Sequence, residues 1–439
     1  MKSNRYCGVG VSARKLAWMT AGGLLLSSLA ATAATEVRIW HSLSSYNAEV
    51  FEDLVDDFNK DQKDVKVKLK SFESEEAIEA ALAAAKKRDD RPHLVQLDDD
   101  RSPEEIAGRS YIQPLHALLA HHPIKDAKWF LSERNTFARD SKGRLVAFPY
   151  MVDVPVMFYN LDAFKKANLK PTVPQRAWNG LQDQLVTLAN NGSRRCPLTT
   201  DQPVSINLEN LAAVNNQLYA SQGNGLTGKG RPAFMFDVMY IRHLSLMISW
   251  VRSELMVKPE FDSVAGQRFA KGECAVLLST SGNLGWFKND KKLDFAISGL
   301  PYYPQVTDKP GNPFVGGSAL WVTAGHSKDS DAASARFLSF LAQPERASKW
   351  YQETGFLPLT KQAFEQTQDG YYKNLGEWKQ LVAVNQAAPA ANSRGFRIDN
   401  YPEIRAMFQQ TLQAALSGNQ PAVTALKTAA TQASAMMKK

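Results

Sequence analysis

Two hydrophobic periodicities alternate in the amino-terminal quarter of the chain. Apolar residues recur at helical spacing over 50–58 and again in the alanine-rich stretch 77–87. Between these stretches, 65–69 alternates valine and leucine with lysine, as in a half-buried strand. A further apolar run at 93–97 ends in three aspartates at 98–100. Strands that alternate with helices in this way are typical of an α/β lobe with a mostly parallel sheet.

The pattern changes in the middle of the chain and then changes back. Residues 208–257 are mainly helical, whereas short apolar strands are expected at 275–279 and 318–323. Strands that return after a long helical stretch indicate that the chain passes between two lobes more than once. We therefore predict two α/β lobes, each a mostly parallel sheet flanked by helices. The predicted boundaries assign 34–145 and 285–345 to the first lobe, and 146–284 and 346–439, with carboxyl-terminal helices at 402–416 and 422–437, to the second.

The first 33 residues have the pattern of a secretory signal peptide. A basic start without acidic residues is followed by an apolar stretch at Leu16–Ala31 and by the small-x-small sequence Ala31-Thr32-Ala33. Removing residues 1–33 takes away four of the 52 basic residues and none of the 44 acidic ones, so the formal charge falls from +8 to +4. We therefore predict an exported, soluble, periplasmic protein, and nucleic acid is not an expected partner.

Only three cysteines occur in the 439 residues, and Cys7 leaves with the predicted signal peptide. Cys196 and Cys274 remain, and in an oxidising compartment an isolated pair is a candidate disulfide. The alternative is two buried free thiols, because the sequence does not supply the Cα spacing that a bridge requires.

Motifs for catalysis are missing from the sequence. It contains no G-x-S-x-G, H-E-x-x-H or P-loop pattern. Residues 223–228 match G-x-G-x-x-G, but the preceding segment looks helical, so a loop is the preferred interpretation. The adjacent His121 and His122 are poorly placed to chelate one ion. We expect a binding protein without metal or cofactor, and a secreted hydrolase is the alternative from another functional class.

Several segments resemble the family-1 solute-binding proteins of ABC importers. The family pattern Y-N-x-D-x-F-x-K-A is similar to residues 159–167, and 269–276, 337–345 and 354–358 also match. Together these segments span nearly the whole chain after the predicted signal peptide. The resemblance implies a monomeric two-lobed clamp of type II with a small-molecule ligand in the cleft between the lobes. It also implies an inner-membrane ABC permease as the partner.

The likeness is strongest to members that bind glycerol 3-phosphate, and it extends to residues 208–210, 316–322 and 395–405. It implies that Arg397, Gly317 and Thr280 contact the ligand. For Arg397 the alternative is an ion pair at a lobe surface.

At other positions where the resemblance implies ligand contact, this chain carries different residues, namely Glu75, Asp99, Asp153 and Phe356. A carboxylate at 4 Å from a phosphate repels it by about 4 kcal/mol at an effective dielectric constant near 20. A glycerophosphodiester with a cationic head group therefore suits these acids better than a free phosphomonoester does. The alternative is that one or more of these acids point away from the cleft. Glycerol phosphate compounds are our first expectation, and a saccharide is the second.

Overall fold

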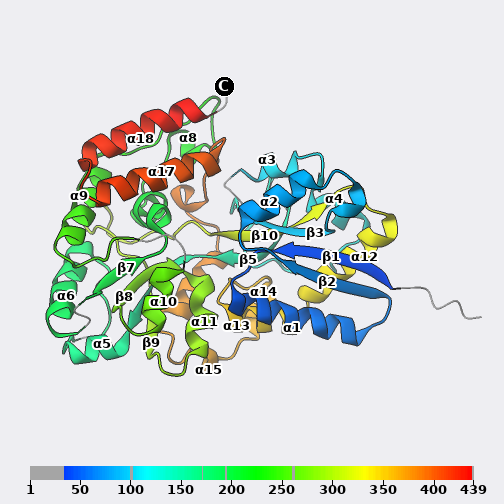
Figure 1. Cartoon of the computed structure of the whole chain (residues 1–439), viewed down its shortest axis with the longest axis horizontal. Coiled ribbons are helices and arrows are strands. Elements are labelled where there is room, and N and C mark those ends of the chain that lie inside the picture. The colour runs from blue at the N-terminus through cyan, green and yellow to red at the C-terminus, as the bar shows by residue number, and fades with distance from the viewer. Residues whose placement is uncertain (1–33, 99–101, 171, 193–194, 260–262, 438–439) are drawn as a thin grey trace, which may run out of the picture. The chain divides into compact units, whose positions relative to one another are not determined.

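The computed structural model describes residues 34–98, 102–170, 172–192, 195–259 and 263–437. The described chain is built on two sheets, each flanked by helices (Figure 1). We call each sheet with its helices a lobe. No helix within these ranges combines the length and the apolar character that a membrane span needs.

The sheet of the first lobe has the strand order β2-β1-β3-β10-β4, and β5 also pairs with β10. β1 is parallel to β2 and β3, as expected, whereas β10 is antiparallel to β3, β4 and β5. The strands are β1 (Thr35–His41), β2 (Val65–Ser71), β3 (Leu94–Asp98), β4 (Ile112–Gln113), β5 (Phe148–Asp153) and β10 (Gly316–Thr323).

The sheet of the second lobe has the order β7-β8-β6-β9. Among the hydrogen-bonded strand pairs of this described sheet, β7 with β8 is parallel, and β6 is antiparallel to both β8 and β9. A mostly parallel sheet was expected here, but β6 arrives directly from β5 in the other lobe, so no helical crossover imposes a parallel direction on it. The strands are β6 (Pro155–Asn160), β7 (Leu198–Thr200), β8 (Val276–Thr280) and β9 (Phe295–Ser298).

Two strands belong to a different lobe from the one that the predicted boundaries assign to them. β5 falls within the range expected for the second lobe but belongs to the first sheet, and β9 falls within the range expected for the first lobe but belongs to the second sheet. The chain thus crosses between the sheets at Val154 and again between β9 and β10.

Helices cover both faces of each sheet. In the first lobe, Val37 and Ile39 of β1 pack with α1 and α12, while Val95 and Leu97 of β3 pack with α2 and α3. In each pair the two residues are two positions apart and face the same side of the sheet. This is the period-2 pattern of strands that are buried on both faces. The helices of this lobe are α1 (Ser45–Asp61), α2 (Glu75–Ala84), α3 (Pro103–Ala107), α4 (Leu115–His121), α12 (Lys328–Leu341), α13 (Pro344–Thr354) and α14 (Lys361–Glu365).

The second lobe has the larger helical layer, in which α17 and α18 pack against each other and against α9. Its opposite face is covered by α10 and α11, through Phe269 and Phe287. The helices of this lobe are α5 (Leu161–Lys166), α6 (Trp178–Asn191), α7 (Asn210–Val214), α8 (Ser221–Asn224), α9 (Val238–Arg252), α10 (Val264–Ala270), α11 (Leu284–Asn289), α15 (Asp369–Tyr372), α16 (Trp378–Ala383), α17 (Tyr401–Leu416) and α18 (Ala422–Met436).

A disulfide joins Cys196 to Cys274, just before β7 and β8, with 4.5 Å between their Cα atoms. Both cysteines are buried. The bridge closes a loop of 78 positions, so it ties the two parallel strands of the second sheet together at their amino ends.

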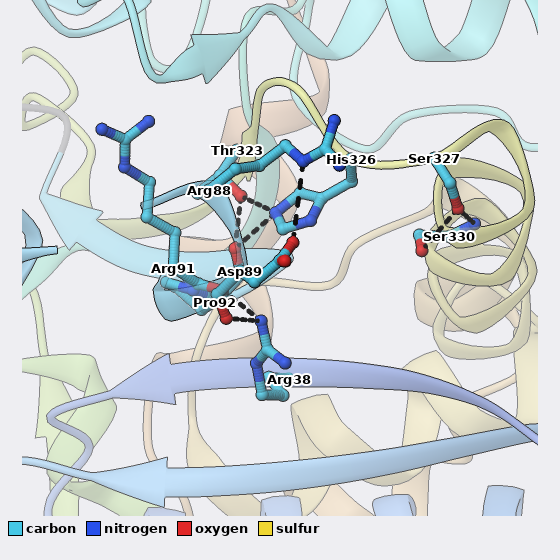
Figure 2. Close-up of polar contacts among 9 residues, drawn as sticks. All are labelled: Arg38, Arg88, Asp89, Arg91, Pro92, Thr323, His326, Ser327 and Ser330. Carbon is cyan, nitrogen blue, oxygen red and sulfur yellow. Dashed lines mark hydrogen bonds and ion pairs between the residues drawn. The ribbon is translucent and has the colours of Figure 1, made fainter. Parts of the chain in front are cut away.

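A polar network occupies the edge of the first sheet where β3 begins and β10 ends. The guanidinium of Arg38 donates to the backbone oxygens of Asp89 and Arg91, both at 2.7 Å, and Nε2 of His326 lies 3.0 Å from the carbonyl oxygen of Pro92 (Figure 2). The ring of His93 lies 4.1 Å from that of His326, centroid to centroid. This network lies at the opposite end of β3 from Asp98.

Candidate ligand-binding cavity

A cavity of about 380 Å³ opens at the ends of strands from both lobes. Asp98, Asp153 and Thr280 each lie at the carboxyl end of a strand that points to it. β10 runs the other way, so it contributes its first residues, 316–318. Ligand sites of α/β proteins are commonly found at this edge of the sheet. The other residues that line the cavity are Ser42, Leu43, Ser44, Asn47, Gln96, Met151, Pro155, Gln202, Ser205, Glu209, Gly282, Asn283, Phe314, Phe356, Tyr401 and Arg405.

Four of the residues expected to contact the ligand line this cavity: Gly317, Thr280, Asp153 and Phe356. Gly317 has a φ of +90°, and a Cβ there would lie 2.2 Å from the carbonyl oxygen of Met151. Only glycine therefore lets β10 lie this close to β5, with its backbone along the cavity wall.

Arg397 and Glu75 are not among the lining residues. Nε of Arg397 lies 3.1 Å from the carboxylate of Glu104 on α3, and its Nη2 donates to the carbonyl oxygen of Arg139 at 2.6 Å. The structure therefore places Arg397 in an ion pair and a backbone contact.

Glu75, the first residue of α2, accepts from the backbone N–H of Asp98 at 3.0 Å, so it is next to a residue that lines the cavity but does not line it itself. Asp99 lies outside the described residues.

The cavity has a basic residue that we did not assign to the site from the sequence, Arg405 of α17. Its Nε donates to the carboxylate of Glu209 at 3.1 Å, and the hydroxyl of Tyr401 donates to the same oxygen at 2.6 Å. Tyr401 and Arg405 are four positions apart on one helix, so they present their side chains on the same face. The only sequence signal for this group was that residues 208–210 and 402–405 fall in segments that resemble the family.

Burial differs sharply between the two members of this ion pair. The side chain of Glu209 is 2% exposed, whereas Arg405 keeps 40% of its side-chain surface accessible. Burial by itself lowers the pKa of Arg405, but the negative charge of Glu209 outweighs it, and the pKa is raised above its usual value. The guanidinium therefore stays charged and keeps donors available to a ligand.

Negative charge dominates the described wall of the cavity. Asp98, Asp153 and Glu209 contribute three carboxylates, and Arg405 contributes one guanidinium. A fourth carboxylate, Asp201, lies behind the wall, where burial, and to a smaller extent the charge of Asp153, raise its pKa to about 7. No cluster of His, Cys, Asp and Glu in the described ranges has the geometry of a metal site.

One apolar residue of the wall, Phe356, belongs to an aromatic stack. Phe356 lies on Trp350 with ring centroids 5.5 Å apart, and Trp350 lies on Tyr150 at 4.6 Å with an interplanar angle of 8°. The indole N–H of Trp350 donates to the carbonyl oxygen of Tyr150 at 2.8 Å, which fixes the stack in place. Phe356 thus presents a rigid apolar ring to the cavity.

Comparison with known proteins identifies the family. The family model described as "Bacterial extracellular solute-binding protein" matches residues 53–386. The chain belongs to this family.

The relatives agree with that assignment. The sn-glycerol-3-phosphate-binding periplasmic protein UgpB of Rhizobium meliloti (strain 1021) is 32% identical over 90% of this chain and 92% of its own length. UgpB of Escherichia coli (strain K12) is 29% identical over 93% of this chain and 94% of its own length. These relatives are solute-binding proteins rather than enzymes, so this family member is expected to take a small-molecule ligand and to work with a membrane permease.

Solved structures show the same two-lobed fold. UgpB from Mycobacterium tuberculosis in complex with glycerophosphocholine has a TM-score of 0.74 at 18% identity, covering 92% of this chain and 98% of that one. Maltose-bound MalE3 of T. maritima has a TM-score of 0.74 at 17% identity, covering 92% of this chain and 100% of that one. At these identities the similarity establishes the fold alone.

Proposed function

We propose that this family member is the periplasmic solute-binding component of an ABC importer and that it captures a glycerol phosphate compound in the cavity. After removal of residues 1–33 it delivers the ligand, as a monomer, to an inner-membrane permease. The observation that supports the ligand class is Arg405, a charged guanidinium in the cavity wall. Guanidinium groups bind phosphate oxygens in a planar, bidentate geometry.

The charge of the wall favours a diester over a monoester. With three carboxylates and one guanidinium, the described wall carries a formal charge of −2. A phosphomonoester adds about −1.5 to −2 at neutral pH, and at 6 Å, with an effective dielectric constant near 20, each carboxylate repels it by about 3 kcal/mol for each unit of phosphate charge. A glycerophosphodiester with a cationic head group carries no net charge, and its cation is attracted to the acids. Such a diester is therefore our preferred ligand, with glycerol 3-phosphate second within this class.

Calorimetry on the mature protein tests this proposal through Asp153, which lines the cavity beside Gly317. Asp153→Asn removes the charge of this residue. It is expected to lower the affinity for sn-glycero-3-phosphocholine and to raise the affinity for sn-glycerol 3-phosphate, each several-fold. The matched control is Asp308→Asn, an exposed aspartate that does not line the cavity, which should leave both affinities unchanged. If Asp153→Asn moved both affinities in the same direction, the charge argument would be wrong.

A saccharide remains the second candidate, because the cavity pairs the rigid ring of Phe356 with many hydroxyl and amide groups. Such groups suit the stacking and hydrogen bonding of a sugar. Maltose belongs in the same titration. Micromolar maltose binding without binding of either glycerol phosphate compound would reverse our order.

A further inference from the structure

A chain of hydrogen bonds runs from a buried carboxylate to the cavity wall. Asp201 follows β7, and although the residue keeps some accessible surface, its Oδ1 is buried and has no hydrogen-bond partner among the described residues. Its Oδ2 accepts from the hydroxyl of Ser279 on β8 at 2.9 Å. The hydroxyl oxygen of Ser279 in turn accepts from Nδ2 of Asn283 at 3.0 Å, and Asn283 lines the cavity.

The order of donors along this chain fixes the orientation of the Asn283 amide. A serine has a single hydroxyl proton, and here Asp201 accepts it, so the oxygen of Ser279 is left as an acceptor for the N–H of Asn283. The amide nitrogen is thus occupied on the protein side. Oδ1 of Asn283 has no hydrogen-bond partner in the described chain, and it is the amide atom left to face the cavity.

We propose that Asp201 is a positioning residue that, through Ser279, holds the Asn283 amide with its oxygen toward the ligand, so that this wall selects a hydroxyl donor. The inference rests on the proposed function, since a glycerol moiety supplies such a hydroxyl. The proposal adds to the binding site a residue, Asp201, that does not touch the ligand. It also gives the cavity wall at Asn283 a defined hydrogen-bonding polarity.

Protonation of Asp201 at Oδ2, the oxygen that faces Ser279, reverses the direction of the chain. A protonated carboxyl donates to Ser279, whose own proton then points to Asn283, and the amide turns its N–H groups toward the cavity. The group that titrates is Asp201, with a pKa raised to about 7 by burial, and Asp153 is the charged residue whose field reaches it. The wall therefore accepts a hydroxyl proton above neutral pH and loses this ability as the pH falls below neutral.

The first test needs no ligand. The side-chain amide ¹⁵N resonance of Asn283 is expected to titrate with a midpoint near pH 7 in the native protein, and to stay flat in Asp201→Asn. The control is Asp331→Asn on α12, a carboxylate whose pKa is likewise raised by burial but which does not line the cavity. That variant should keep the titration. An amide resonance that is flat in the native protein, or that still titrates in Asp201→Asn, would overturn the proposal.

The second test measures binding of sn-glycero-3-phosphocholine by calorimetry between pH 5.5 and 8.5. The native affinity should fall about 3- to 10-fold from the alkaline to the acidic end, the value of one hydrogen bond, and Asp201→Asn should remove this dependence. Ser279→Ala should remove it equally, and the two variants combined should lose no more than either alone. If no glycerol phosphate compound binds the native protein, the proposed function fails, and the amide titration still decides the role of Asp201.

Discussion

Replacing Arg405 with glutamine separates its role in folding from its role in binding. Glu209 is 2% exposed and would lose its cation, and breaking a buried pair from one side costs about 3–5 kcal/mol. Arg405 itself is 40% exposed, so solvent already screens part of the attraction. We therefore expect Arg405→Gln to lower the free energy of unfolding by about 2 kcal/mol, measured by urea denaturation.

Binding is expected to suffer more than stability. Truncating a charge that is hydrogen-bonded to a buried ligand group costs about 2–5 kcal/mol, which is a loss of affinity of about 30-fold or more. Calorimetry with sn-glycero-3-phosphocholine measures this loss. The control is Arg346→Gln, which breaks ion pairs to Asp57 and Asp61 on α1 and does not line the cavity.

The double variant Arg405→Gln with Glu209→Gln distinguishes the two effects. It removes both charges while an amide oxygen at 209 still accepts from the hydroxyl of Tyr401, so most of the lost stability should return. Affinity for the phosphate ligand should stay low, because no guanidinium remains. A double variant that bound the ligand as tightly as the native protein would refute the assignment of Arg405 to the phosphate.

Three further predictions concern the disulfide, the pH dependence of stability and processing. Replacing both Cys196 and Cys274 with alanine should lower the free energy of unfolding by about 4 kcal/mol, because the bridge closes a loop of 78 positions; an unchanged denaturation midpoint would contradict this. Burial is the main reason that the pKa of His93 is lowered from 6.5 to about 4. The stability that neutral His93 provides is therefore complete above pH 6.5 and declines as the pH falls toward 4. The total decline is at most roughly 3 kcal/mol. His93→Gln keeps an acceptor for the N–H of Arg38 and should flatten this decline in pH-dependent unfolding, whereas an equal slope would exclude His93 as its source. Intact mass of the exported protein should show a first residue at Ala34 or Thr35, and retention of residues 1–33 would contradict cleavage.

Local periodicity was sufficient to find most elements that bury one face. The alternation at 65–69 is part of β2, the helical spacing at 50–58 lies within α1, and the predicted terminal helices correspond to α17 and α18. These elements are encoded locally, because burying one face of a strand or helix requires apolar residues at a period of 2 or 3.6. The family could also be recognised from short segments, because each segment combines a local structural element with the characteristic residues that flank this element.

The tertiary structure decided the direction of the strands and which residues line the cavity. No periodicity distinguishes a parallel strand from β10, which enters the first sheet from the other lobe and runs antiparallel. Arg397 and Arg405 lie eight positions apart, yet Arg397 is held by Glu104 and by the carbonyl oxygen of Arg139, while Arg405 is aligned with Tyr401 on one face of α17 and lines the cavity. Which arginine lines the cavity thus depends on contacts with residues that are hundreds of positions away, and such contacts exist only once both lobes are folded.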